Sequence, residues 1–315
     1  MLRVILIDSA HEILVNELQS MGFACDFFEG TRRSEIEKII GNYEGAIIRS
    51  KVVFDRQMID KAHKLKFIAR VGAGMESIDV DYAAKKSIVC LNSPEGNRDA
   101  VAEHALGMLL SLMNHLNQAD RQIRQGLWLR EENRGMEIKG KTVAIIGYGN
   151  MGRAFAQRLS GFEASMIAYD KYKKKYSDSF VKETDMETIF REAHILSLHV
   201  PLTEETYYMV DYEFLSRFRN PIILINTSRG HVVKTADLVT CLKNKKVIAA
   251  ALDVLEYEPH SFETLDAKNL PDDFAYLQKS DNVLLTPHVA GWTTESKIKL
   301  AQVLADKIRT LNLTS

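Results

Sequence analysis

Short runs of apolar residues, rich in valine and isoleucine, alternate along the chain with stretches in which apolar residues recur at helical spacing. This alternation predicts parallel β-sheets covered by helices on both faces. The runs form two series. The first comprises residues 4–8, 45–49, 65–71 and 88–92, and the second comprises residues 142–147, 165–170, 195–200, 221–227, 248–254 and 283–288. We therefore expect an α/β protein with two domains, each built on a doubly wound parallel sheet.

The runs of the second series are continuously apolar, which is the pattern of strands buried on both faces. Six such strands are the number expected of a complete dinucleotide-binding fold. Between the two series, apolar residues from Asp99 to about Gln125 fall close to helical spacing and predict one long helix that links the domains. A final helix is predicted over residues 294–311.

Composition narrows the class of protein. A chain of 315 residues exceeds the roughly 250–300 residues at which one hydrophobic core usually stops growing, so two domains are expected. The net charge of −1 gives no overall field for binding nucleic acid or an anionic membrane. Three widely spaced cysteines indicate neither a disulfide framework nor a metal site. Because no apolar run approaches the length of a membrane span or a signal-peptide core, we expect a cytoplasmic protein.

The glycine pattern G-x-G-x-x-G occupies residues 147–152, between a predicted strand and a predicted helix. Gly147 permits a tight turn, Gly149 lets the backbone approach a pyrophosphate, and Gly152 allows close packing of helix on strand. The helix N-terminus attracts the phosphates. Asp170 ends the next predicted strand, 18 residues after Gly152, where an acid binds the adenosine ribose. The sequence therefore predicts a dinucleotide site.

Asp170 favours NAD over NADP, because its carboxylate accepts hydrogen bonds from ribose hydroxyls and repels a 2′-phosphate. The basic run at residues 171–175 is an alternative site for a 2′-phosphate. A solvated loop explains the same run more simply. How strictly the chain prefers NAD stays open at this point.

Polar residues follow three strands of the second series, at residues 226–230, 251–259 and 286–291. Open α/β sheets bind their ligands at this edge. These segments contain Arg229, Glu258 and His288. Taken singly, each has a structural explanation, such as a histidine in a Pro-His turn or an arginine paired with a surface acid. Because all three follow the dinucleotide-binding pattern along the chain, each after the end of a predicted strand, we interpret them as catalytic residues.

With these motifs, and with residues 71–79 and 92–97, the chain resembles the D-isomer-specific 2-hydroxyacid dehydrogenase family over nearly its full length. The resemblance implies an NAD-dependent oxidoreductase that transfers a hydride at C2 of a small 2-hydroxy or 2-oxo acid. It implies a flavodoxin-like substrate domain over residues 1–97 and a Rossmann NAD-binding domain over residues 98–290. Residues 291–315 would be a C-terminal helix that returns to the substrate domain.

The resemblance also implies roles for individual residues. His288 would be the general acid/base, Glu258 its carboxylate partner, and Arg229 the ligand of the substrate carboxylate or carbonyl oxygen. An imidazole suits proton transfer near neutral pH, a neighbouring carboxylate stabilises the imidazolium, and a guanidinium offers fixed donors. Further cofactor contacts would come from Asn150, Met151, His199, Val200, Pro201, Thr227, Ser228, Asp253 and Gly291.

Within the family, the chain is most similar to the phosphoglycerate dehydrogenases. This similarity implies a homodimer through the region of Asp99 to Gln125. The end of the chain at Ser315 leads us to expect no regulatory extension. The resemblance implies substrate contacts from Arg49, Ser50, Arg70, Ala73, Gly74 and Asn97, and from Arg130 across a subunit boundary.

Two alternatives remain. A hydroxypyruvate or glyoxylate reductase would keep the mechanism without a phosphate site. C-terminal-binding-protein corepressors use the same fold and NAD to control assembly with peptide partners, and they retain the arginine, glutamate and histidine. The near-neutral charge and the lack of a basic tail favour the enzyme.

Overall fold

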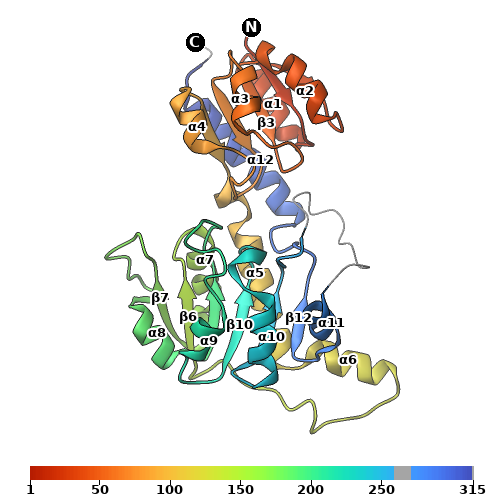
Figure 1. Ribbon diagram of the computed structural model, residues 1–315, viewed down its shortest axis with the longest axis vertical. Coiled ribbons are helices and arrows are strands. Elements are labelled where there is room, and N and C mark those ends of the chain that lie inside the picture. Colours follow the sequence, from red (N-terminus) through yellow and green to blue (C-terminus); the bar gives the residue numbers. More distant parts are fainter. Residues whose placement is uncertain (259–270, 314–315) are drawn as a thin grey trace. The chain divides into compact units, whose positions relative to one another are not determined.

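The computed structural model describes residues 1–258 and 271–313. The chain divides into two compact units, each with its own parallel sheet (Figure 1). The first unit comprises Met1–Arg98 and Trp292–Ser315, and the second comprises Asp99–Gly291. The predicted fold class, two parallel-sheet α/β domains, is confirmed. Within the described residues, no helix is both long enough and apolar enough to cross a membrane.

The first unit contains a five-stranded sheet in the order β2-β1-β3-β4-β5, in which every neighbouring pair is parallel. This is the strand order of flavodoxin-like folds. The sequence predicted four of the five strands and missed β2, an edge strand whose residues are at most half-buried and so lack a continuous apolar run. The strands are β1 (Arg3–Leu6), β2 (Ala24–Phe27), β3 (Gly45–Ile48), β4 (Phe67–Arg70) and β5 (Val89–Asn92).

Helix α12 (Thr294–Arg309) brings the end of the chain back to the first unit, where it contacts α1, β4 and β5. Its buried residues, among them Leu300 and Leu304, share one core cluster with Leu14 and Leu18. A second cluster fills the other face of the sheet. The remaining helices of this unit are α1 (Glu12–Ser20), α2 (Arg33–Ile39), η1 (Ile40–Asn42), α3 (Arg56–Lys61) and α4 (Val80–Lys85).

The second unit contains a seven-stranded parallel sheet in the order β12-β11-β10-β9-β6-β7-β8. The chain runs outward from β6 through β7 and then returns to β9 on the other side of β6. Ligands of open α/β sheets bind where the strand order reverses in this way. The sequence missed only β8, a two-residue edge strand. The strands are β6 (Thr142–Ile146), β7 (Ser165–Tyr169), β8 (Lys182–Glu183), β9 (Ile195–Leu198), β10 (Ile222–Asn226), β11 (Val247–Leu252) and β12 (Val283–Leu285).

Helices cover both faces of this sheet, so its central strands are buried on both sides (Figure 1). One core cluster joins the sheet to α8, α9, α10 and α11, and the other joins it to α5 and α7. The helices are α5 (Pro94–Met113), α6 (Leu116–Arg124), α7 (Asn150–Leu159), η2 (Ser160–Phe162), α8 (Met186–Glu192), α9 (Tyr212–Ser216), η3 (Gly230–Val232), α10 (Thr235–Lys243) and α11 (Asp272–Lys279).

The single helix predicted from Asp99 to Gln125 is wrong. The structure has two helices there, α5 and α6, separated at His115, whose φ of +52° is left-handed. The apolar spacing continues across this break, which is why the sequence concealed it. No residue of α6 is buried, so its apolar side chains are not held by the core of the second unit.

Two glycines of α5 can be compared by substitution to alanine. Gly96 tests the packing of α5 on α12, and Gly107 tests helix propensity alone. A methyl group on Gly96 would lie 2.5 Å from the backbone nitrogen of Leu300 in α12, whereas one on Gly107 would meet no described residue within 4 Å. We expect Gly96→Ala to lower the free energy of unfolding by about 1–3 kcal/mol, because α12 must move. Gly107→Ala should raise it by about 0.5–1 kcal/mol. Urea denaturation measures both changes, and equal effects would contradict this packing of α5 on α12.

Candidate active and cofactor site

The glycine loop connects β6 to α7, and at two of its three glycines a side chain would collide with the backbone. Gly147 has a φ of +89°, and a methyl group there would lie 2.5 Å from the carbonyl oxygen of His199. A methyl group on Gly152 would lie 2.1 Å from the carbonyl oxygen of Gly147. By contrast, no atom of the described chain lies within 4 Å of a methyl group on Gly149, and none of its side chains caps α7. The first residues of α7 are Asn150 and Met151. The N-terminus of α7 can therefore accept an anion.

Asp170 lies directly after β7 and faces the glycine loop. Its Oδ2 accepts a hydrogen bond from the backbone nitrogen of Tyr148 at 3.0 Å, and its Oδ1 accepts from those of Tyr172 and Lys173 at 3.0 and 3.1 Å. These donors hold the carboxylate at the end of β7. Two lysines of the basic run have their own partners: Lys171 pairs with Glu205, and Lys173 donates to the carbonyl of Tyr148.

Two buried polar atoms at the ends of β9 and β10 have no hydrogen-bond partner among residues 1–258 and 271–313. They are Nδ1 of His199 and Oγ1 of Thr227. The other ring nitrogen of His199 lies 2.8 Å from Oγ of Ser197. Since buried polar groups are normally paired, a ligand at this edge would supply the missing partners. Val200 and Pro201 continue the same edge, so the residues present fit a bound dinucleotide.

His199 is a neutral residue at ordinary pH. Part of its side chain reaches solvent, but its Nδ1 is buried and its ring packs against Phe155 at 5.4 Å between centroids. Burial lowers the pKa of His199 to about 4, because the charged imidazolium would be desolvated. This favours a role as a wall of the site over a role as a general base.

A buried asparagine that the sequence analysis did not single out shapes the turn that carries Arg229. Oδ1 of Asn226 accepts hydrogen bonds from the backbone and the hydroxyl of Ser228 at 3.0 and 2.7 Å, and its amide donates to the carbonyl of Arg229. A methyl group on Gly230 would lie 2.0 Å from the carbonyl oxygen of Leu255. The turn is therefore pressed against the segment that leads to Glu258.

Asp253 follows β11, and only 1% of its surface is exposed. Its Oδ1 accepts from the hydroxyl of Thr286 at 2.6 Å and from the backbone nitrogen of Val289 at 2.9 Å, while Oδ2 accepts from that of Ala290 at 2.9 Å. The carboxylate thus holds the segment that contains His288. These donors use three of the roughly four acceptor positions of the carboxylate, and the predicted cofactor contact of Asp253 stays a prediction.

His288 and Glu258 form a close pair. Nδ1 of His288 lies 2.7 Å from Oε2 of Glu258, and the backbone of His288 is left-handed, with a φ of +54°. The backbone nitrogen of Leu255 donates to the other carboxylate oxygen of Glu258. A carboxylate in this position orients the ring, so that Nε2 points away from Glu258. This arrangement can move a proton to or from a substrate oxygen.

The carboxyl edge of the second unit therefore holds three predicted catalytic residues, which follow β10, β11 and β12 in turn. Arg229 lies in the β10 turn and Glu258 in the segment after β11. His288 follows β12, and Gly291 closes the unit. Arg229 donates to the carbonyl of Ser228 at 2.6 Å. Arg130, predicted to contact substrate, is exposed in the segment after α6.

The other predicted substrate residues belong to the first unit. Arg49 and Ser50 follow β3, and Arg70 ends β4. Nε of Arg70 donates to the carbonyl of Arg49 at 2.8 Å, and its Nη1 donates to the carbonyl of Gly74. Arg70 thus holds two loops together. Two further members of the predicted set are Ala73, whose carbonyl accepts from Asn92, and Asn97, whose Oδ1 is buried.

Sequence reasoning also missed Asp8, which lies at the end of β1 and is 3% exposed. Its Oδ2 accepts a hydrogen bond of 2.6 Å from the backbone nitrogen of Arg49. An acid directly after the apolar run of residues 4–7 was the signal that could have identified it. Asp8 and Arg70 fix the backbone of Arg49 from both sides.

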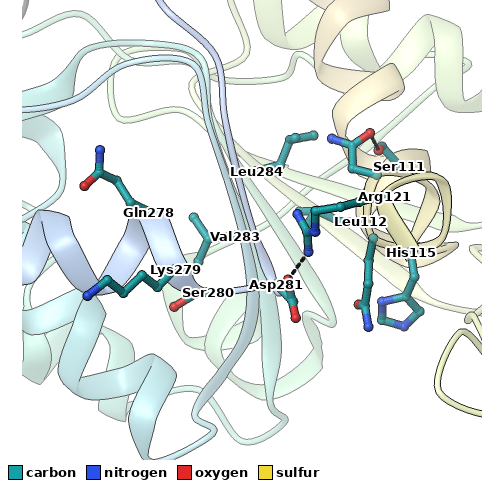
Figure 2. A pocket seen from close by; sticks show the side chains of 12 residues that line it. Ser111, Leu112, His115, Arg121, Gln278, Lys279, Ser280, Asp281, Val283 and Leu284 are labelled. Atoms are coloured by element: carbon teal, nitrogen blue, oxygen red, sulfur yellow. Dashed lines mark hydrogen bonds and ion pairs between the residues drawn. The ribbon is translucent and has the colours of Figure 1, made fainter. Parts of the chain in front are cut away.

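A separate depression of about 490 Å³ lies at the opposite edge of the second unit (Figure 2). The ends of α5 and α11, helix α6 and the beginning of β12 line it, and an ion pair between Arg121 and Asp281 crosses it. Because His288 follows the carboxyl end of β12, this polar depression is not part of the candidate site.

Comparisons with known proteins point to one family of dehydrogenases. Residues 106–290 match the family described as D-isomer specific 2-hydroxyacid dehydrogenase, NAD binding domain. The chain is 33% identical to D-3-phosphoglycerate dehydrogenase of Archaeoglobus fulgidus over 98% of this chain and 56% of that protein. It thus spans about half the length of the phosphoglycerate dehydrogenases that it matches. Hydroxypyruvate reductase of Thermotoga maritima is 35% identical over 89% of this chain and 88% of that protein.

Among solved structures, D-lactate dehydrogenase from Aquifex aeolicus, complexed with NAD and lactic acid, has a TM-score of 0.83. It is 25% identical, and the match covers 98% of this chain and 95% of that chain.

The lowered pKa of His199 predicts a pH dependence of stability. Below about pH 6.5 the unfolded chain binds a proton at this histidine, but the folded chain does not until about pH 4. The free energy of unfolding should therefore fall as the pH drops through this window, by about 1–2 kcal/mol from pH 7 to pH 5. Urea denaturation of wild type and His199→Gln measures it.

In His199→Gln this part of the pH dependence should disappear, whatever the absolute stability of the variant. His63→Gln removes an exposed histidine and should keep the wild-type dependence. If wild type and His199→Gln lose the same free energy between the two pH values, His199 is not buried as a neutral ring.

Proposed function

Because the chain belongs to the D-isomer-specific 2-hydroxyacid dehydrogenase family, we propose that it transfers a hydride between NAD and C2 of a D-2-hydroxy or 2-oxo acid. The cofactor is NAD, as in the family's NAD-binding domain and the NAD-bound D-lactate dehydrogenase. The observation that carries the proposal is the 2.7 Å contact between His288 and Glu258. We propose the second unit as the NAD-binding domain and the first unit as the substrate domain.

Each residue of the site has a chemical task in this proposal. Bound NAD supplies or accepts the hydride. His288 takes the proton of the C2 hydroxyl during oxidation and returns it during reduction. Glu258 orients the ring and balances the positive charge that develops on it. Arg229 binds the substrate carboxylate with its planar donors. Asp253 keeps the His288 segment in place through Thr286, Val289 and Ala290.

As substrate we propose D-3-phosphoglycerate, oxidised to 3-phosphohydroxypyruvate in serine synthesis. Two observations support it. The similarity to phosphoglycerate dehydrogenases extends over 98% of this chain. In the part of the chain that the structure describes, no carboxylate pairs with Arg49, so its guanidinium is available for a substrate anion.

Reduction of hydroxypyruvate or glyoxylate is the second candidate. The similarity to hydroxypyruvate reductase covers 88% of that protein, compared with 56% of the phosphoglycerate dehydrogenase. Two donors of Arg70 are also engaged by the carbonyls of Arg49 and Gly74. Arg70 would then have fewer N–H donors to offer a phosphate than the sequence suggested, although its charge remains.

Turnover measurements test the function directly. We expect NADH formation from D-3-phosphoglycerate with a kcat/KM at least about tenfold above that for D-glycerate or D-lactate, because a buried charge-assisted contact contributes a factor of this order. The reverse reaction is followed as NADH consumption with hydroxypyruvate and glyoxylate. Preference for these two would select the second candidate, and tight NAD binding without any turnover would favour a corepressor-like binding protein.

His288→Gln should lower kcat about 10²- to 10⁴-fold, which is the usual contribution of a general acid/base. NAD binding should stay within a few-fold of wild type, and His63→Gln should match wild type in both measurements. If His288→Gln retains kcat, the proposed acid/base role is wrong. If it loses kcat and NAD binding together, His288 has a structural role.

We also propose that the protein is a homodimer assembled through α5, α6 and the segment that follows. Every residue of α6 is at least partly exposed, and Leu116 and Ile123 are among the exposed apolar residues of this region. Leu127 and Trp128, which follow α6, are exposed as well. Several exposed apolar side chains within one short segment favour an interface there. Arg130 lies directly after them, where it would meet the partner subunit.

Light scattering tests the dimer. We expect a mass of twice 35.7 kDa for wild type and of 35.7 kDa for the double variant Ile123→Asp/Trp128→Asp, because two carboxylates would be buried without partners. Val53→Asp changes an exposed apolar residue of the first unit and should leave the dimer intact. A monomeric wild type, or a dimeric double variant, would rule out this interface.

A further inference from the structure

The side chains of Arg49 and Trp292 stack on each other within the first unit. The guanidinium carbon of Arg49 lies 4.7 Å from the centre of the Trp292 ring. Trp292 directly precedes Thr293, the N-cap of α12, and 69% of the tryptophan is exposed. An exposed tryptophan thus lies against an arginine at the carboxyl end of β3.

Packing of α12 does not explain the tryptophan. An apolar residue before an N-cap often packs against the fourth residue of the helix, but here that residue is Lys297. The capping box of α12 is complete without the indole, because Thr293 and Ser296 form it with their own side chains and backbone. The exposed ring is therefore available for another role.

Arg49 differs from other arginines of the first unit. Arg33 and Arg56 pair with Asp55 and Asp79, whereas no carboxylate of the described residues pairs with Arg49. Its backbone is fixed by Asp8 and Arg70, so the remaining freedom is in its side chain. Stacking on an aromatic ring restricts that freedom and leaves the in-plane donors of the guanidinium accessible.

We propose that Trp292 is a positioning residue that acts through Arg49 and makes the chain prefer 2-oxo acids with a second anionic group beyond C2. This inference rests on the proposed function and deepens it. A stacked guanidinium presents a planar fork of donors that matches a carboxylate or a phosphate. A lysine at this position would carry the charge without the flat face that the indole holds.

Two substrates that differ only in a phosphate group test the proposal: 3-phosphohydroxypyruvate and hydroxypyruvate. We expect Trp292→Ala to lower the kcat/KM ratio of the first to the second about 5- to 10-fold, with the loss in KM. Trp292→Phe should retain most of the ratio. Arg49→Lys should lower the ratio about as much as Trp292→Ala does. Phe27→Ala removes another exposed aromatic residue of the first unit and should leave the ratio as in wild type.

A double-mutant cycle tests the route through Arg49. Once Arg49→Ala is present, adding Trp292→Ala should change the ratio no further, because the residue on which the indole acts is gone. If the two substitutions lower the kcat/KM ratio additively, Trp292 does not act through Arg49. An equal loss for both substrates would make Trp292 merely structural, and a ratio that rises in Trp292→Ala would mean that the indole withholds Arg49 from the substrate.

Tryptophan emission provides a readout that does not depend on turnover. The chain has two tryptophans, so Trp292 is the only one in a Trp128→Phe background and alone gives the tryptophan emission. Titration with 3-phosphoglycerate should change its emission saturably, D-glycerate should do so only at higher concentration, and Arg49→Met should abolish the response. If neither 2-oxo acid is reduced, the proposed function fails, and this titration alone decides the inference: a flat response overturns it.

Discussion

The carboxylate of Asp253 is the buried charge on which the geometry of the candidate site depends. A buried carboxylate is costly unless hydrogen bonds replace its water, and here one hydroxyl and two backbone nitrogens do so. All three donors come from residues 286–290. The ionic group at the end of β11 thereby determines the path of the segment after β12, including the left-handed backbone of His288. The candidate acid/base residue is thus placed by a carboxylate on a different strand end.

Two glycines let other loops of the candidate site approach one another closely. Gly230 lets the Arg229 turn approach the segment that carries Glu258, and Gly147 lets the glycine loop approach the end of β9. In each case a single methyl group would collide with a carbonyl oxygen. The glycine loop and the turns that carry the candidate catalytic residues can therefore converge on one edge of the sheet, because side chains are absent at these close backbone contacts.

In the first unit, residues expected to contact substrate also hold the site together. Arg70 crosses between two loop carbonyls, and Asp8 binds the backbone of Arg49, so the loop after β3 is held at both sides. The guanidinium of Arg49 is left to stack on Trp292. A rigid backbone with one oriented cation is a simple way to select among 2-hydroxy acids that share the same reacting carbon.

The sequence by itself determined the fold class, ten of the twelve strands and the dinucleotide loop, because strands buried on both faces and obligatory glycines leave local patterns. It could not identify β2 and β8, whose exposed edge residues carry no apolar run, or the break at His115, across which the helical spacing continues. Resemblance pointed to His288, Glu258 and Arg229. Only the tertiary structure decided that Asp253 anchors a loop, that Arg70 holds carbonyls and that Trp292 meets Arg49. These partners lie far apart along the chain, and hydrogen bonds depend on distance in space rather than on position in the sequence.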